Sequence, residues 1–333
     1  MWKYLLTFSF LSLACLCDQG QALRVDSNYA APGRLEDIGG RRIHLICSGT
    51  GTPSIVLIPG GGAFSIDWSL VQSGIENTTR VCAYDRAGLG WSDSGPADET
   101  VEESISDLHA ALHSAGEKGP FVLVGASIAG AYIQAYQHEY PGEVAGLVFS
   151  NSSNRIGFAG KNHSGLIWDL SEEDIKSVFP FPPSNNKREP ATSLSDPFDR
   201  LPAKWRPVRL WLSNRLQEKW DTAQTGPESL LSIRKEFLRE FDESDLHKNE
   251  FPLGKLPVIV VSSNVVANDS LRHSREGAAA RLDFLSSNSL HIHASGSGHE
   301  IHLYQPDQVI LALKIAVMAM RKSISLSKAS DRR

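Results

Sequence analysis

Several features that would place this chain in a common class are missing from its sequence. The 33 Lys and Arg residues are scattered and the net charge is −5, so the basic patch typical of nucleic-acid-binding proteins is absent. Beyond residue 22 no apolar run reaches the length of about eighteen residues that spans a bilayer. We also find no internal repeat and no metal-ligand spacing among His, Cys and carboxylate residues. We expect no nucleic-acid partner and no metal, and small neutral or weakly polar substrates.

The N-terminus has the pattern of a secretory signal peptide over residues 1–22. One Lys precedes an apolar stretch from Tyr4 to Cys17, and Gly20-Gln21-Ala22 forms a small-x-small cleavage site. An uncleaved anchor is the alternative. We therefore expect a secreted or periplasmic protein with no stable membrane association after cleavage.

Cysteine is scarce, and only Cys47 and Cys82 lie beyond the signal segment. Each is part of an apparent strand. An even pair in an exported protein permits a disulfide, whereas two buried thiols acting as small apolar residues fit the sequence equally well.

Strand and helix patterns alternate from about Arg34, which predicts an α/β sheet covered on both faces. Gly39-Gly40 between two strand-like runs indicates a hairpin. Continuous apolar runs such as "PSIVLIPG", "PFVLVGAS" and "LPVIVVSS" are typical of doubly buried parallel strands. The predicted core comprises residues 23–151 and 250–321.

The pattern changes over residues 152–249, where proline clusters and tryptophan-rich helical segments replace the buried strands. This segment is predicted to be an inserted helical cap. The polar tail 322–333 is expected to be disordered.

Ser127 lies where an apolar strand gives way to a helical pattern, in "FVLVGASIAGAYIQAYQ". A serine nucleophile on a strained strand-turn-helix elbow needs very small neighbours, which Gly125, Ala129 and Gly130 provide. The fifth position of the usual G-x-S-x-G pattern is Ala129, a modest departure. A helix N-cap serine is the alternative interpretation.

A serine nucleophile needs an adjacent base. His299 follows the last predicted strand in "GSGHEIHLYQPD", and Gly296 and Gly298 make its loop adaptable. His302 is the rival candidate, but its neighbours resemble the start of a packed segment. We therefore predict His299 as the base.

Four segments, "LIPGGGAFSIDW", "RVCAYDRAGLGWSD", "LVGASIAGAYIQAYQHEYPGEVAGLVFSN" and "SNSLHIHASGSGHEIHLYQPDQVI", resemble successive landmarks of the α/β-hydrolase superfamily, in its cap-bearing serine esterase-like members. The resemblance extends over about residues 34–320 and leaves the cap unmatched. It implies an eight-stranded, mostly parallel sheet whose first strand pair is antiparallel, a Ser-acid-His triad, and no cofactor. It also makes the strands of Cys47 and Cys82 neighbours, which we expect to be parallel.

The resemblance further implies an oxyanion hole formed by the backbone N–H groups of Gly61 and Ile128. Many members have His-Gly where this chain has Pro59-Gly60, but backbone donors survive that change. Asp85 and Arg86 are expected to tie the turn that contains them to neighbouring loops.

The acid of the triad is less clearly marked. Family members most often place it just beyond the seventh strand, where Asp269 is the carboxylate at about the right place. The other location is the end of the sixth strand, where many relatives have Asp and this chain has Asn151. We favour Asp269.

The sequence thus predicts an exported serine hydrolase that cleaves an ester or related acyl bond of a small molecule through an acyl-enzyme. The same triad supports acyl transfer, C–C hydrolysis and cofactor-free peroxidation in this superfamily, so the fold alone does not choose among them. A ligand-binding protein with little turnover is the alternative from another class.

Overall fold

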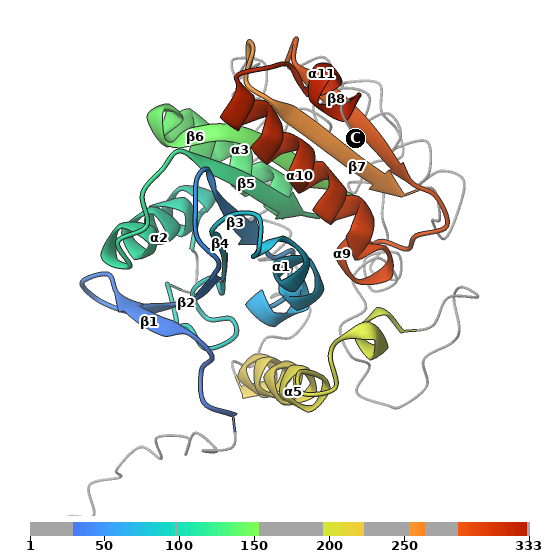
Figure 1. Cartoon of the computed structure of the whole chain (residues 1–333). Coiled ribbons are helices and arrows are strands. Elements are labelled where there is room, and N and C mark those ends of the chain that lie inside the picture. Colours follow the sequence, from blue (N-terminus) through green and yellow to red (C-terminus); the bar gives the residue numbers. More distant parts are fainter. Residues whose placement is uncertain (1–28, 97–98, 153–195, 223–252, 264–285, 332–333) are drawn as a thin grey trace, which may run out of the picture. The chain divides into compact units, whose positions relative to one another are not determined.

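One sheet of eight strands forms the centre of the protein, in the order β1-β2-β4-β3-β5-β6-β7-β8 (Figure 1). The computed structural model describes residues 29–96, 99–152, 196–222, 253–263 and 286–331. The strands are β1 Arg34–Asp37, β2 Arg42–Ser48, β3 Ser54–Ile58, β4 Val81–Tyr84, β5 Phe121–Ala126, β6 Val144–Ser150, β7 Val258–Ser263 and β8 Ser289–Ala294. All of them lie in the unit that spans Ala31–Arg333.

Strand direction agrees with the predicted fold class. β1 and β2 pair antiparallel, and so do β2 and β4, while every other neighbouring pair is parallel. The hairpin between β1 and β2 turns at Gly39, whose φ of +88° is in the left-handed region that favours glycine. The eight-stranded, mostly parallel sheet is therefore confirmed.

Helices cover both faces of the sheet because alternate strand residues point to opposite sides. Val56 and Ile58 of β3 pack in one cluster with α2 (Val101–Ser114) and α3 (Ala129–Glu139). Ile55 and Leu57 pack in a second cluster with α1 (Ser69–Ile75) and α10 (Pro306–Lys322). All of β3 is buried, as its continuous apolar run predicts.

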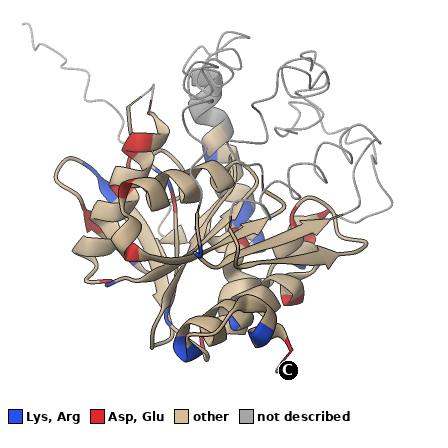
Figure 2. Cartoon of the chain, turned by 90° about the horizontal axis from the view of Figure 1, so that it is seen from above, with Lys and Arg blue, Asp and Glu red and all other residues tan. Residues whose placement is uncertain are grey.

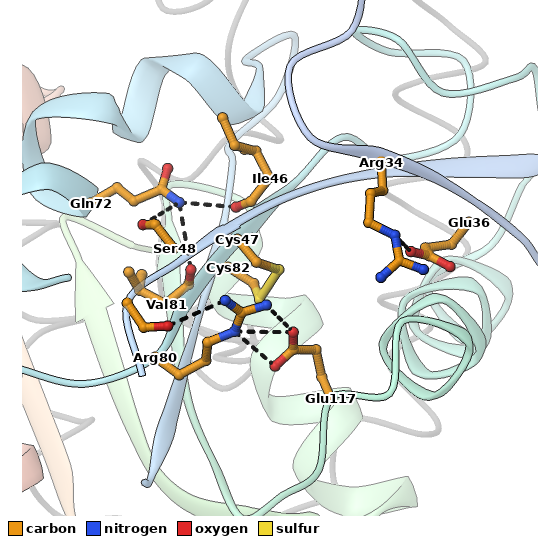
Figure 3. Close-up of a disulfide and its surroundings, with 11 residues drawn as sticks. Arg34, Glu36, Ile46, Cys47, Ser48, Gln72, Arg80, Val81, Cys82 and Glu117 are labelled. Atoms are coloured by element: carbon orange, nitrogen blue, oxygen red, sulfur yellow. Dashed lines mark hydrogen bonds and ion pairs between the residues drawn. A yellow bond between two sulfur atoms is a disulfide. The ribbon is translucent and has the colours of Figure 1, made fainter. Parts of the chain in front are cut away.

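Cys47 and Cys82 form a disulfide across β2 and β4 (Figure 3). The two residues are directly opposed in an antiparallel pair, with Cα atoms 4.0 Å apart. The expectation that these strands run parallel was wrong, because β2 enters the sheet from the β1 hairpin and runs against β4. Beside the disulfide, the Gln72 amide donates to the carbonyl oxygens of Ile46 and Val81 and joins the same two strands.

The tail is more ordered than the sequence indicated. Residues Leu326–Ser330 form α11, capped by the Ser325 hydroxyl, which accepts from the Lys328 N–H. Leu326 and Ala329 are buried against the α10 side of the sheet. The prediction of disorder over 322–333 is thus corrected for this helix, since two apolar residues three apart give it one face to bury.

Only part of the predicted cap is described. It contains the short 3-10 helix η6 (Pro197–Arg200) and the helix α5 (Arg206–Thr222), and the rest of residues 152–249, like the predicted signal segment 1–22, lies outside the described residues. Within the described part of the chain, no helix is both long and apolar enough to cross a membrane. Acidic and basic residues are interspersed along the described elements (Figure 2).

Candidate active site

Ser127 occupies a sharp turn between β5 and α3. Its φ is +55°, a strained value for a residue other than glycine. A Cβ on Gly125 would lie 2.5 Å from the Ala129 carbonyl oxygen, so that position has to be glycine. An N-cap residue ordinarily has an extended backbone, whereas Ser127 has a positive φ, so its conformation does not fit the N-cap interpretation. The local geometry is that of a nucleophile elbow, and it accommodates the Ala129 methyl group, which is fully buried.

The glycine-rich loop after β3 lies against this elbow. A Cβ on Gly60 would be 3.2 Å from Ser127 Cβ, and a Cβ on Gly61 would be 3.9 Å from Ile128 Cγ2. Among the residues that the structure describes, neither Gly61 nor Ile128 donates its N–H to a backbone acceptor. The two predicted oxyanion-hole donors are therefore neighbours with N–H groups available to a ligand.

Arg86 holds the loop after β3 in place. Its Nη1 donates to the Pro59 carbonyl oxygen at 2.6 Å and its Nη2 to the Gly60 carbonyl oxygen at 3.0 Å. Because a trans peptide points its C=O and N–H in opposite directions, fixing the Gly60 oxygen also fixes the direction of the Gly61 N–H. Arg86 is almost fully buried and lies over the Tyr132 ring, so this contact is protected from water.

Asp85 anchors the same region from the other side. Its fully buried carboxylate accepts from the Ser65 N–H at 2.7 Å and the Trp91 N–H at 3.2 Å, and lies 2.7 Å from His44 Nδ1. Gly90 makes room for it, since a Cβ there would come within 2.1 Å of the carboxylate. The prediction that Asp85 and Arg86 tie their turn to neighbouring loops is confirmed.

His299 and Asn151 meet although they are 148 residues apart. Asn151 directly follows β6, is buried, and has a φ of +47°. Its Nδ2 lies 3.1 Å from each of three atoms: His299 Nδ1, the His299 carbonyl oxygen and Ser263 Oγ. An amide nitrogen carries two hydrogens, so at most two of these contacts receive a proton at once.

His299 Nδ1 accepts from the amide only in the tautomer that leaves this nitrogen without a hydrogen. In the other tautomer the two amide hydrogens go to the His299 carbonyl oxygen and to Ser263 Oγ. Asn151 thus holds the main chain of His299 and packs beside its ring. Asp269, the predicted acid, lies outside the described residues.

His302 has a different environment from His299. It is buried in the short helix α9 (Ile301–Tyr304) and stacks on Trp68 with ring centroids 4.5 Å apart. Burial lowers the pKa of His302 to about 3, because charging the ring there would require its desolvation. His302 therefore stays neutral within the core, as its sequence neighbours indicated.

The sequence and the overall fold match known proteins. Residues 55–312 match the model of the Alpha/beta hydrolase family. The chain belongs to that family. Membership of this family supports the prediction that the protein is a hydrolase.

Named relatives of this alpha/beta hydrolase are distant. "Uncharacterized protein YbdG" of Bacillus subtilis is 22% identical over 301 residues, covering 87% of this chain and 86% of that protein. "Probable transporter efuK" of Hormonema carpetanum is 35% identical over 127 residues, covering 36% of this chain and only 18% of that protein. The crystal structure of a bromoperoxidase from Bacillus anthracis is similar in fold, with a TM-score of 0.60 at 19% identity over 86% of this chain and 99% of that chain.

In this family member the helix α5, within the predicted cap, is bound to the segment that follows the glycine-rich loop. Arg209 of α5 donates from Nε to the buried Asp67 carboxylate at 2.9 Å. Its guanidinium also lies over the rings of Phe64, at 4.6 Å, and Phe198, at 4.1 Å. Burial raises the pKa of Asp67, and the opposing charge of Arg209 works against that rise. Sequence analysis missed this pair, since nothing in the local pattern links Arg209 to a residue of the core.

A small hollow lies where α5 faces the turn after β4. Apolar side chains and glycines dominate its lining, with one Arg: Phe64, Gly88, Leu89, Gly90, Leu212, Arg215 and Leu216. Leu216 also approaches the glycine-rich loop after β3, because a Cβ on Gly62 would be 4.0 Å from Leu216 Cδ2. The hollow is therefore adjacent to the loop that carries Gly61.

Proposed function

We propose that this chain is a serine hydrolase that cleaves an ester or related acyl bond of a small molecule. The observation that carries the proposal is Ser127, held at a φ of +55° on a turn between β5 and α3, against the loop that contains Gly60 and Gly61. Strain of this kind is typical of functional positions in proteins.

The proposed reaction begins when His299 removes the proton from the Ser127 hydroxyl. Ser127 Oγ then forms a bond to the substrate carbonyl carbon, and the carbonyl oxygen becomes an oxyanion that the Gly61 and Ile128 N–H groups stabilise. Collapse breaks the ester C–O bond, and the alcohol leaves with the proton from His299. Water, deprotonated by His299, releases the acid and restores Ser127.

Asp269 and Asn151 have separate proposed roles. Asp269 supplies the negative charge that favours protonated His299 in the transition state. Asn151 is a positioning residue, because its amide donates to the His299 carbonyl oxygen at 3.1 Å. This division applies to the tautomer that carries a hydrogen on His299 Nδ1, in which the amide donates to the His299 carbonyl oxygen and to Ser263 Oγ.

For the substrate, we propose that the acyl group extends toward the hollow between α5 and the turn after β4. Leu212 and Leu216 line it. Hydrolysis rates for p-nitrophenyl esters of increasing chain length define the preferred acyl group, and Leu216→Trp is expected to shift the preference to shorter chains. Unchanged chain-length preference in Leu216→Trp would count against the hollow as the acyl site.

Export is part of the proposal as well. Disulfides persist in oxidising compartments, so the Cys47–Cys82 bond supports a secreted or periplasmic location. N-terminal sequencing of the protein isolated from its source tests cleavage after residue 22.

Labelling with a fluorophosphonate probe tests the central assignment. Wild-type protein is expected to be labelled and Ser127→Ala not, while Ser73→Ala, which removes an exposed hydroxyl on α1, is labelled as wild type. Ser127→Ala is also expected to lose ester turnover to below about one per cent of wild type, since losing a triad serine costs many orders of magnitude. An unlabelled wild-type protein would favour the ligand-binding alternative.

A further inference from the structure

We propose that His109, His113 and Glu143 form a binding site for a divalent transition-metal ion of the Zn²⁺ type. His109 and His113 are four residues apart on α2, so both side chains lie on one face of that helix. Glu143 ends the short 3-10 helix η3 (Pro141–Glu143) that leads into β6. The inference is independent of the proposed hydrolase chemistry.

The three candidate ligand atoms converge on one point. His109 Nε2 lies 3.2 Å and His113 Nε2 lies 2.9 Å from the same oxygen, Glu143 Oε1. All three atoms lie within 4.8 Å of one another. With metal–ligand bonds of about 2.0–2.2 Å, the corners of a tetrahedron are separated by about 3.4 Å. The two separations from Glu143 Oε1, 3.2 and 2.9 Å, are within about half an ångström of that value.

The surroundings hold these groups in the orientation that a metal ion requires. The Tyr136 hydroxyl donates to the second oxygen, Glu143 Oε2, at 2.7 Å, which directs Oε1 toward the histidines. The His109 ring stacks on Tyr140 with centroids 4.0 Å apart and an interplanar angle of 11°. Supporting contacts of this kind fix ring and carboxylate orientation in metal sites.

The exposure of the three side chains and the chemistry of their ligand atoms also fit a transition-metal site. The side chains of His113, His109 and Glu143 are 53%, 29% and 26% exposed, so an ion and a completing water can enter. Two imidazole nitrogens and one carboxylate oxygen favour Zn²⁺ and its transition-metal neighbours over Mg²⁺ and Ca²⁺, which prefer oxygen ligands.

The metal site lies near the N-terminal end of β6, whereas the proposed active site lies near its C-terminal end. Glu143 precedes β6 and Asn151 follows it, and seven strand residues span about 23 Å. A bound ion would therefore join α2 to η3 as a structural clamp. Sequence analysis overlooked it, because the histidine pair supplies two ligands and the third comes from a different element.

Isothermal titration of metal-stripped, full-length protein without a histidine tag, using Zn²⁺ as the probe, tests the proposal. We expect one ion per chain and a rise in melting temperature with Zn²⁺ but not with Ca²⁺. His113→Ala is expected to bind about 100-fold more weakly or worse, and Tyr136→Phe about tenfold more weakly. His138→Ala, which removes an exposed imidazole from α3, serves as the matched control and should bind as wild type.

Three outcomes would overturn the proposal. They are an absence of binding with Zn²⁺ in excess, binding that is equally tight in His113→Ala, and an equal loss in His138→Ala. Because His113 is more than half exposed, its replacement should leave the fold intact, and far-ultraviolet circular dichroism checks this. Glu143→Gln provides a second variant, which keeps the volume and a hydrogen-bond acceptor for Tyr136 but loses the charge, and it should also bind more weakly.

Discussion

Replacing Asn151 and Asp269 in turn distinguishes which of the two residues orients His299. In Asn151→Ala, two neutral hydrogen bonds are lost, those to the His299 carbonyl oxygen and to Ser263 Oγ. At about 1 kcal/mol each, they contribute about 2 kcal/mol, which corresponds to a fall in kcat/KM of about 30-fold if all of it serves to hold His299. Loss of a triad acid costs about 10⁴-fold, so Asp269→Asn should fall about 10³- to 10⁴-fold.

Ester hydrolysis under steady-state conditions, with the concentration of competent sites measured by fluorophosphonate labelling, distinguishes these magnitudes. Asn77→Ala, an exposed amide after α1, is the control and should be unchanged. A fall of 10³-fold or more in Asn151→Ala, with near-normal turnover in Asp269→Asn, would refute the assignment of Asp269. Asn151 would then be the orienting group.

Asn151→Asp adds a third arm to the same experiment. A carboxylate cannot donate to the His299 carbonyl oxygen, which lies 3.1 Å from the present amide nitrogen. We therefore expect lower activity than wild type despite the acidic residue that many relatives have at this position. Higher activity in Asn151→Asp would show that the ring contact, rather than the main-chain contact, dominates.

Three further predictions concern the supports of the site. Arg86→Met should lower kcat by about 10- to 100-fold, less than the 10²- to 10³-fold typical of deleting an oxyanion donor, because the Gly61 N–H is freed but still present; steady-state kinetics and a thermal melt separate this from unfolding. Replacing Cys47 and Cys82 together by Ala should lower the free energy of unfolding by about 4 kcal/mol, from loop-closure entropy over a sequence separation of 35, as measured by urea denaturation; an unchanged midpoint would contradict it. Arg209→Met leaves the buried Asp67 carboxylate unpaired, so its pKa should rise further above its ordinary value. A carboxyl group whose pKa is raised in the folded state makes the protein less stable as pH rises. Thermal melts should therefore show a larger loss of stability for this variant at pH 8 than at pH 5, and equal losses at the two pH values would argue against this prediction.

Local patterns in the sequence were sufficient for the fold class and for the turn that carries Ser127. A doubly buried strand has to be apolar throughout, as β3 is, and a strained elbow requires Gly125, so both leave a mark within a few residues. The packed environment of His302 was also readable from its sequence neighbours.

Only the tertiary structure determined which of these segments are in contact. Only the sheet order brings Asn151 at the end of β6 to His299 after β8, and only the direction of β2 places Cys47 opposite Cys82. The same holds for the hydrogen bonds that Arg86 donates to the glycine-rich loop. Such contacts join residues whose own neighbours carry no sign of the partner.

The two histidines of α2 show the physical reason most clearly. Their spacing specifies that they share a helix face, since that depends on the helical repeat alone. Whether they face solvent, a hydrogen-bonding partner or a metal ligand depends on where Glu143 lies, and that position follows from the packing of α3 and β6. Sequence by itself determined the periodicity, the turns and the local setting of Ser127, and the long-range packing of strands and helices decided which distant side chains meet.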